Sequence, residues 1–272
     1  MTASTHAPSH VILIVDDQPG EQFLYPEFLL FRELFRRHGI AAEIADAREL
    51  VFDGTALLHQ GQPVDLVYNR CTDFNLSVDH HAALRAACMQ DAVVLTPSPR
   101  HHALYADKRH LVRLSDEDWL QRIGVSAATR RILASHVPKA RFVTATQAEQ
   151  LWSERKRYFF KPFAGYASRG AYRGDRLTKR VWSGIVSSGN YIAQEFAPPA
   201  TRRGSPGDQA SMLKFDLRCV TYGTEIRLLN ARLYQGQTTN MRTLSGGLAS
   251  VFLVKGDQLP AGSGSSPNQT TA

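Results

Sequence analysis

The apolar positions of the first hundred residues form short runs that alternate with segments of helical spacing. Residues 11–15 (VILIV) are a β-branched run that ends at Asp16-Asp17, as in a buried parallel strand whose C-terminal end opens onto a loop. Residues 28–37 carry apolar side chains at helical spacing, and His38-Gly39 supplies a helix stop. The chain is therefore predicted to begin with a strand and a helix.

The same alternation continues to about residue 105. We expect strands at 41–44, 64–68 and 92–95, a helix at 79–88, and a helical connection near 108–114. Short apolar strands that alternate with helices imply a parallel sheet with right-handed crossovers. Residues 1–105 are thus predicted to form an open parallel α/β domain.

From Arg141 onward the pattern changes to strands that follow one another more closely. Helices are predicted at 147–157 and 177–187, and strands at 158–161, 191–196, 212–222 and 225–234. The turn at Tyr222-Gly223-Thr224 suits a hairpin, so we expect antiparallel sheets with helices. The second domain is placed at 106–259, with a lid subdomain at about 141–190, and the Gly, Ser and Pro-rich tail 260–272 is expected to be flexible.

Composition and charge narrow the class of protein. The chain has 272 residues, 43% hydrophobic and 21% charged, as in folded proteins of one large or two ordinary domains. Its formal charge is +7, and arginine pairs well with carboxylates and phosphates. Basic clusters such as Arg36-Arg37, 155–157 and Arg202-Arg203 are short. No nucleic-acid recognition module appears, so we expect no nucleic-acid partner.

Cysteines and the N-terminal residues point to a location. Cys71, Cys88 and Cys219 form no CxxC pair and are odd in number, so a disulfide framework is not expected and a reducing cytoplasm fits. The first ten residues lack a basic start followed by an apolar core, and the apolar runs are shorter than a membrane span. We expect a cytoplasmic protein without membrane association.

One loop carries candidate chemistry. In residues 158–174 (YFFKPFAGYASRGAYRG), Lys161 ends an apolar strand just before a basic loop with Gly165, Gly170 and Gly174. An ammonium beside backbone N–H groups that glycine leaves accessible suits a polyphosphate, which indicates a nucleotide site. The loop is neither GxxxxGK[ST] nor a GxGxxG that opens a helix. A β-hairpin with glycine turns is the alternative interpretation.

Several polar landmarks follow one another along the chain. They are Asp107-Lys108, Phe160-Lys161-Pro162, residues 193–199 (AQEFAPP), Asp216-Leu217-Arg218, and residues 231–240 (ARLYQGQTTN) with Gly246-Gly247. Their order and spacing resemble the ATP-grasp superfamily of carboxylate-amine ligases, particularly the glutathione synthetase type. The resemblance covers most of the chain. Residues 216–240 are its most specific part because they join three polar landmarks to one hairpin.

The resemblance implies a fold and a cofactor set. An N-terminal pre-ATP-grasp domain would precede an ATP-grasp domain in which ATP lies between two small antiparallel sheets. Lys108 and Lys161 match the lysines that hold the phosphates, and Asp216 and Asn240 match ligands of Mg²⁺. The other nucleotide contacts implied are Ser168, Arg169 and Gly170 in the loop, and Gln194, Glu195, Phe196 and Ala197 in the hinge strand that faces adenine.

The reaction implied is ADP-forming C–N ligation. ATP would phosphorylate a carboxylate on an amino acid or small peptide, and an amine would capture the acylphosphate, which needs positioning and charge neutralisation. Arg218 and Arg232 would stabilise the transferred phosphoryl group and the oxyanion.

The chain departs from the family at the metal site. The stretch before Asn240 is Gln237-Thr238-Thr239, where these ligases carry an acidic residue, so Asp216 is the remaining clear carboxylate. The loss of one anionic ligand weakens divalent-metal binding. Two alternatives therefore stand beside the ligase: a nucleotide-binding pseudoenzyme, and a small-molecule kinase.

The predicted parallel sheet supplies candidates for the substrate. Asn69 and Arg70 follow the strand at 64–68, at the edge where parallel sheets bind ligands. We predict that Arg70 grips a substrate carboxylate through two hydrogen bonds; an ion pair with Asp73 is the alternative. Asp16-Asp17 is interpreted as a strand-end loop that faces a cleft.

Metal binding by histidine is not expected. His80-His81 and His101-His102 are adjacent pairs without a nearby cysteine, and neighbours on a helix do not easily face one ion, so no zinc site is predicted. The expected partners are a small-molecule carboxylate and an amine. The sequence leaves the oligomeric state open, with a homodimer as the candidate assembly.

Overall fold

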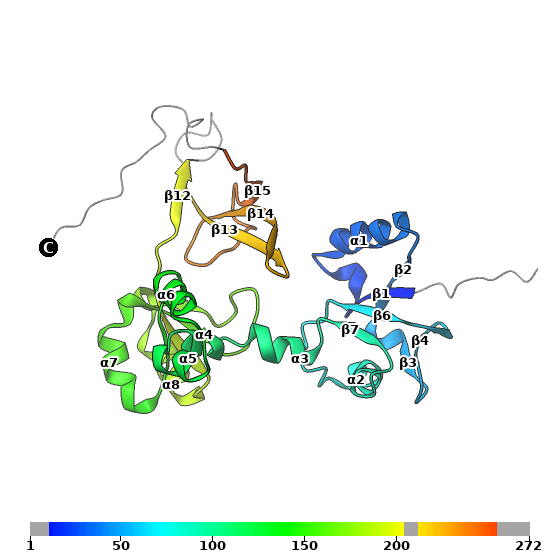
Figure 1. Ribbon diagram of the computed structural model, residues 1–272, viewed down its shortest axis with the longest axis horizontal. Coiled ribbons are helices and arrows are strands. Elements are labelled where there is room, and N and C mark those ends of the chain that lie inside the picture. Colours follow the sequence, from blue (N-terminus) through cyan, green and yellow to red (C-terminus); the bar gives the residue numbers. More distant parts are fainter. Residues whose placement is uncertain (1–10, 204–211, 255–272) are drawn as a thin grey trace, which may run out of the picture. The chain divides into compact units, whose positions relative to one another are not determined.

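A computed structural model of the chain describes residues 11–203 and 212–254 (Figure 1). The predicted flexible tail, 260–272, lies outside the described residues. The chain divides into two compact units between Asp107 and Lys108. It is a mixed α/β protein with one parallel sheet and several antiparallel sheets. No helix of the described ranges is both long and apolar enough to cross a bilayer.

The first unit is built on a four-stranded parallel sheet, as predicted. Its strands are β1 (Val11–Asp16), β2 (Ala41–Asp46), β6 (Leu66–Asn69) and β7 (Val94–Thr96), in the order β2-β1-β6-β7. Helices α1 (Tyr25–Arg37) and α2 (Ala82–Met89) lie on opposite sides of this sheet (Figure 1).

The apolar run of β1 explains this arrangement. Leu13 and Val15 point to one face and are buried together with Leu84 of α2. Ile14 points to the other face, and like Phe28 of α1 it is completely buried. A strand that is buried on both faces needs apolar residues at every position, which is what residues 11–15 supply.

Several elements of the first unit were not predicted. Residues 50–63 form an antiparallel sheet of β3 (Leu50–Phe52), β4 (Leu57–His59) and β5 (Gln62–Pro63). The helix predicted at 79–88 is divided into a 3-10 turn, η3 (Asp79–His81), and α2. The remaining short elements are η1 (Pro19–Glu21), η2 (Ala47–Glu49), α3 (Pro99–His101) and η4 (His102–Ala106).

The second unit begins with three helices. Helix α4 (Arg109–Leu114) is the predicted connection, whereas α5 (Glu117–Arg122) and α6 (Ala127–His136) were not predicted. The side chains of Asp116 and Ser126 accept hydrogen bonds from backbone N–H groups at the starts of α5 and α6. Such N-caps stabilise short helices by satisfying backbone donors that lack a partner within the helix.

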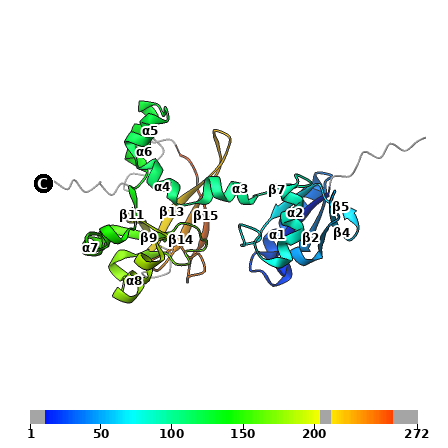
Figure 2. The same ribbon diagram turned by 90° about the horizontal axis from the view of Figure 1, so that it is seen from below.

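An antiparallel sheet follows these helices. It contains β8 (Ala140–Phe142), β9 (Tyr158–Pro162), β10 (Tyr172–Arg173) and β11 (Tyr191–Glu195), in the order β10-β9-β11-β8. Helices α7 (Ala148–Ser153) and α8 (Lys179–Ser188) pack on one face (Figure 2). The shared core places Tyr158 and Phe160 of β9 against Leu151, Trp182 and Ile185. The 3-10 turns η5 (Ala145–Gln147), η6 (Arg155–Arg157) and η7 (Gly174–Arg176) complete this part.

The last sheet is also antiparallel. It contains β12 (Ala200–Arg203), β13 (Met212–Tyr222), β14 (Glu225–Tyr234) and β15 (Gly247–Ser250), in that order. The predicted hairpin is confirmed at both strands, and Gly223 turns the chain with φ +60°, a conformation that glycine adopts without strain. The register sets Asp216 directly opposite Arg232.

Candidate active site

A cavity of about 680 Å³ in the second unit is lined by both antiparallel sheets. The β9–β11 sheet contributes Phe159, Lys161, Gln194 and Glu195, and the β13–β14 sheet contributes Lys214, Phe215, Asp216 and Tyr234. The loop after β9 and the residues after β11 close the sides. The volume falls in the range typical of sites for small ligands.

Two lysines from distant segments line this cavity. Lys161 Nζ donates a hydrogen bond of 2.6 Å to Gln194 Oε1, and Lys108 Nζ donates one of 3.1 Å to the carbonyl oxygen of Gly165. Burial lowers the pKa of Lys161, and the charge of Lys108 lowers it further. Two ammonium groups that repel each other in a partly desolvated cavity favour an anion between them.

The charges around the cavity favour the same kind of ligand. Four cationic side chains line it, Lys108, Lys161, Arg173 and Lys214, against the two carboxylates of Glu195 and Asp216. Lys214 Nζ donates a hydrogen bond to the carbonyl oxygen of Gly236. A concave surface with excess positive charge attracts anions that carry several charges.

The segment after β11 is a fixed wall of the cavity. Gln194 Nε2 donates to the carbonyl oxygen of Pro138 at 3.1 Å, so the Gln194 side chain is bonded at both ends. The backbone N–H groups of Glu195 and Phe196 are bonded to carbonyl oxygens. That of Ala197 has no partner among the described residues, and Pro198-Pro199 has no N–H to offer. Ala197 is thus a backbone donor available to a ligand.

The loop after β9 supplies only part of the predicted contacts. Gly165 and Ser168 line the cavity, and Ser168 has a left-handed φ of +60°. Arg169 and Gly170 are outside the lining, and Arg169 donates to the Tyr166 hydroxyl at 2.8 Å.

Gly174 is outside the lining too, and its role is packing. A Cβ added there would lie 1.7 Å from the carbonyl oxygen of Arg155. The expectation that Gly174 opens the backbone toward a phosphate is therefore wrong.

Asp216 is the carboxylate that could hold a metal. It accepts hydrogen bonds of 2.7 and 3.0 Å from the Arg232 guanidinium and one of 3.1 Å from Thr239 Oγ1. A carboxylate has about four lone-pair sites, and Mg²⁺ binds through one or two carboxylates plus phosphate oxygens. Asp216, which shares the cavity with the lysines, therefore fits one Mg²⁺ held jointly with a phosphate. The stretch before Asn240, Gln237-Thr238-Thr239, brings no carboxylate to the lining, and Glu195 is the other carboxylate among the described lining residues.

Three other predicted residues lie outside the cavity lining. Asn240 Oδ1 accepts the backbone N–H of Arg242 at 3.1 Å. Arg218 is exposed and lies two residues beyond Asp216, so it shares the same face of β13. Arg232 reaches the cavity only through Asp216. Their predicted roles remain predictions.

The predicted substrate residues of the first unit are held by internal contacts. Asn69 is buried. Its Nδ2 donates a hydrogen bond to the carbonyl oxygen of Pro97, and its Oδ1 accepts one from the backbone N–H of Cys71. Arg70 pairs with Glu27 at 2.9 Å and donates to the Tyr68 hydroxyl. The alternative prediction of an ion pair between Arg70 and Asp73 is wrong, because the carboxylate that pairs with Arg70 is that of Glu27.

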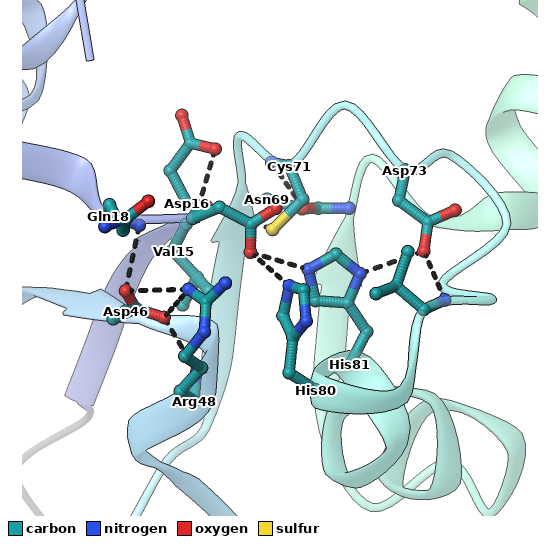
Figure 3. Close-up of polar contacts among 12 residues, drawn as sticks. Val15, Asp16, Gln18, Asp46, Arg48, Asn69, Cys71, Asp73, His80 and His81 are labelled. Atoms are coloured by element: carbon teal, nitrogen blue, oxygen red, sulfur yellow. Dashed lines mark hydrogen bonds and ion pairs between the residues drawn. The ribbon is translucent and has the colours of Figure 1, made fainter. Parts of the chain in front are cut away.

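The adjacent histidines do face one group, contrary to expectation. Figure 3 shows the rings of His80 and His81 directed at one carboxylate oxygen. This oxygen is Asp17 Oδ1, which lies 2.8 Å from His80 Nε2 and 2.9 Å from His81 Nε2. They can do so because His80 and His81 lie in the 3-10 turn η3, before α2 begins. Beside them, burial raises the pKa of Asp16 to about 6.

Comparisons with known proteins give matches in structure only. No family model matches the chain, and no curated protein matches it. The ATP-grasp ligase PsnB complexed with minimal precursor, Mg and ADP is 15% identical, with a TM-score of 0.48 over 93% of this chain and 79% of PsnB. The D-cycloserine synthetase DcsG is 16% identical, with a TM-score of 0.43 over 68% of this chain and 58% of DcsG. The chain thus spans less than two thirds of DcsG.

The matches include the superfamily that the motifs resemble. The TM-scores lie below 0.5 and the identities below 25%. These similarities therefore assign no function, and the residues of the cavity carry the functional information.

Sequence reasoning missed several cavity residues. Arg173, Lys214 and Tyr234 line the cavity although none was predicted as a site residue. Arg173 and Tyr234 lie within the motifs at 158–174 and 231–240. The position of Lys214 could have been predicted, because it lies two residues before Asp216 and therefore on the same face of β13. Arg173 comes from β10, which pairs antiparallel with β9. Residues 158–174 therefore form the β-hairpin considered as the alternative, and the loop between its strands also lines the cavity.

Proposed function

We propose that the chain is an ATP-dependent ligase that forms an amide or peptide bond between a carboxylate and an amine. One observation carries the proposal: Lys108 and Lys161, far apart in sequence, line one cavity between two antiparallel sheets. The cavity has a cationic excess on its walls, and the backbone N–H of Ala197 in its lining has no partner among the described residues.

We propose one orientation for ATP in this cavity. Its phosphates would contact the ammonium groups of Lys108 and Lys161, whose repulsion an anion relieves. Its adenine would accept a hydrogen bond from the Ala197 N–H and pack beside Phe159 and Phe196, which line the same cavity. In this orientation the segment 194–197 would make the nucleotide contacts predicted for it.

The proposed chemistry needs charge neutralisation more than a covalent group from the protein. A substrate carboxylate oxygen attacks the γ-phosphorus, the bond to the β–γ bridging oxygen breaks, and ADP leaves. The amine then attacks the acyl carbon, the C–O bond breaks, phosphate leaves and the nitrogen loses a proton to water. Lys161 and Lys108 would hold the triphosphate in line for the first step.

Mg²⁺ fits this proposal through Asp216. When bound, the ion would supply positive charge to the phosphate oxygens. The protein's own part is to hold the Asp216 carboxylate in place, which Arg232 and Thr239 do through three hydrogen bonds. We keep Asn240 as a predicted further ligand, and Arg218 and Arg232 as predicted sources of charge for the acylphosphate.

The substrates proposed are an amino acid or small peptide and an amine. Asn69 and Arg70 remain the predicted substrate contacts, which requires Arg70 to exchange its pairing with Glu27 for one with the substrate. The cytoplasmic location and the homodimer likewise remain predictions.

Trapping with hydroxylamine tests the proposal. The purified chain is incubated with ATP, Mg²⁺, hydroxylamine and pooled amino acids or dipeptides. ADP release that depends on a carboxylate, together with a hydroxamate of that carboxylate, is the expected result. A rise in melting temperature with ATP but no turnover would instead identify a binding module. A phosphorylated product that survives hydroxylamine would identify a kinase.

A further inference from the structure

A second cluster of side chains lies in the first unit, apart from the residues that line the cavity. Asp17 Oδ1 lies 2.8 Å from His80 Nε2 and 2.9 Å from His81 Nε2. All three atoms lie within 4.8 Å of one another. The rings of His80 and His81 converge on this point from η3, as Figure 3 shows. Two imidazoles and one carboxylate are a common ligand set for divalent transition metals.

The distances match those between ligands of a metal ion. An ion about 2.0–2.1 Å from each ligand atom puts neighbouring ligands about 2.8–3.0 Å apart at right angles and about 3.3–3.4 Å apart in a tetrahedron. The two distances from Asp17 Oδ1 are 2.8 and 2.9 Å. They suit adjacent positions of an octahedral ion, and a small outward shift would suit a tetrahedral one.

A second carboxylate orients one of the imidazoles. His81 Nδ1 lies 2.9 Å from Asp73 Oδ2, which also accepts the backbone N–H of Val78 at 2.9 Å. The Asp73 carboxylate accepts a hydrogen bond at Nδ1 and so fixes the His81 ring with Nε2 directed at Asp17. A carboxylate behind a ligating histidine is the usual outer shell of a metal site.

The position in the fold favours a ligand. Asp17 follows β1 directly. The chain crosses from β1 to β2 on one side of it, and then from β2 to β6 on the other side of β1. Parallel sheets bind ligands outside the carboxyl ends of their strands, at the point where the strand order reverses. That point here is the gap between β1 and β6.

The exposed fractions of the three side chains show which side of the cluster faces solvent. The side chain of His81 is 0% exposed, whereas those of Asp17 and His80 are 32% and 27% exposed. One ligand is therefore held in the core and the other two lie at the surface. An ion bound to all three would keep coordination positions on the solvent side for water or a substrate atom.

We propose that Asp17, His80 and His81 form a binding site for one divalent first-row transition ion, with Asp73 as the positioning residue for His81. Imidazole ligands favour Zn²⁺, Co²⁺ or Fe²⁺ over Mg²⁺. The site uses none of the residues of the nucleotide cavity and does not depend on the proposed ligase activity.

Metal titration of the full chain tests the proposal. The protein is freed of metal with a chelator and titrated with Zn²⁺ by calorimetry and with Co²⁺ by its visible absorption. One ion per chain is expected, with Co²⁺ bands that report nitrogen and oxygen ligands. His80→Ala and Asp17→Asn should lose this binding, and Asp73→Asn should weaken it by about 10- to 100-fold. His81 is left unchanged because its burial makes a folding defect the first effect of replacing it.

A matched variant separates the site from other histidines. His38 is exposed at the end of α1 and outside the cluster, so His38→Ala should bind both ions as the unaltered chain does. The circular dichroism spectrum of each variant checks that it is folded. Zn²⁺ and Co²⁺ binding that is absent from the unaltered chain, or equal in His80→Ala, Asp17→Asn and His38→Ala, would overturn the proposal and leave a hydrogen-bonded cluster only.

Discussion

Lys161 Nζ donates a 2.6 Å hydrogen bond to Gln194 Oε1, and this contact joins β9 to β11 at the cavity wall. Gln194 in turn donates to the carbonyl oxygen of Pro138. The lysine is therefore held by a buried amide that is itself fixed. Its ammonium is positioned before a ligand arrives, which lowers the entropy lost on binding.

Lys161→Met is expected to separate binding from stability. It should weaken ATP-analogue affinity at least about tenfold because a charge–phosphate contact is lost. The unfolding free energy should change little, since a lost hydrogen bond of about 1 kcal/mol is offset by removal of a partly desolvated charge. Lys156→Met, at an exposed position of η6, is the control for calorimetry and urea unfolding. Equal ATP affinity in both variants would remove Lys161 from the site.

The lowered pKa of Lys161 predicts a pH dependence of binding. Below that pKa the ammonium is present and affinity for ATP is constant; above it, binding must take up a proton, so affinity falls as pH rises toward 10.5, the ordinary lysine value. In the same window the unfolded chain holds more protons than the folded chain, so the unfolding free energy of the free protein rises with pH. Calorimetry in buffers of different ionisation enthalpy detects the proton uptake. Lys161→Met should show none, and uptake that persists in this variant would contradict the assignment.

The Asp216–Arg232 ion pair predicts a defect in turnover. Arg232→Gln removes both hydrogen bonds of the guanidinium to Asp216. We expect kcat to fall more than the KM for ATP rises, because Asp216 loses its fixed orientation. Both side chains are about one third exposed, so the unfolding free energy should fall by no more than about 1 kcal/mol.

Arg227→Gln is the matched control for that experiment. Arg227 lies on the same strand and pairs with Glu225 at 2.8 Å, with both side chains more than half exposed. Its kcat should equal that of the unaltered chain. A kcat for Arg232→Gln that also stays unchanged would show that the Asp216 pair does not act in turnover.

Gly174 and Gly184 offer a paired test of packing. A Cβ on Gly174 would lie 1.7 Å from the carbonyl oxygen of Arg155, whereas a Cβ on Gly184 in α8 meets nothing within 4 Å. Gly174→Ala should therefore destabilise the protein by about 3 kcal/mol or more through a backbone shift. Gly184→Ala should stabilise it by about 0.5–1 kcal/mol. Urea unfolding measures both, and an equal effect of the two substitutions would contradict the close approach of η6 and η7.

Local patterns in the sequence predicted most strands of the fold, but they did not predict the short helices of the second unit. The strands 212–222 and 225–234 have the predicted bounds because a short turn fixes their register. The helices at 117–122 and 127–136 bury almost no side chains, so they carry little of the apolar periodicity on which prediction depends.

The candidate site shows the same division. Lys108 and Lys161 were predicted from motifs and line one cavity. Arg173 and Lys214 depend on strand register and were not predicted. His80 and His81 were misjudged because their directions depend on a 3-10 turn just before α2, where the rule for α-helical neighbours does not hold.

Successive side chains of β9 point to opposite faces of its sheet. Tyr158 and Phe160 lie in the core beneath the helices, and Phe159 and Lys161 line the cavity. Inserting or deleting a single residue within β9 would send the lysine inward and an aromatic ring outward. The ligand preference of the cavity can therefore change through substitutions at alternate positions of β9, such as 159 and 161, while the length of the strand must stay the same.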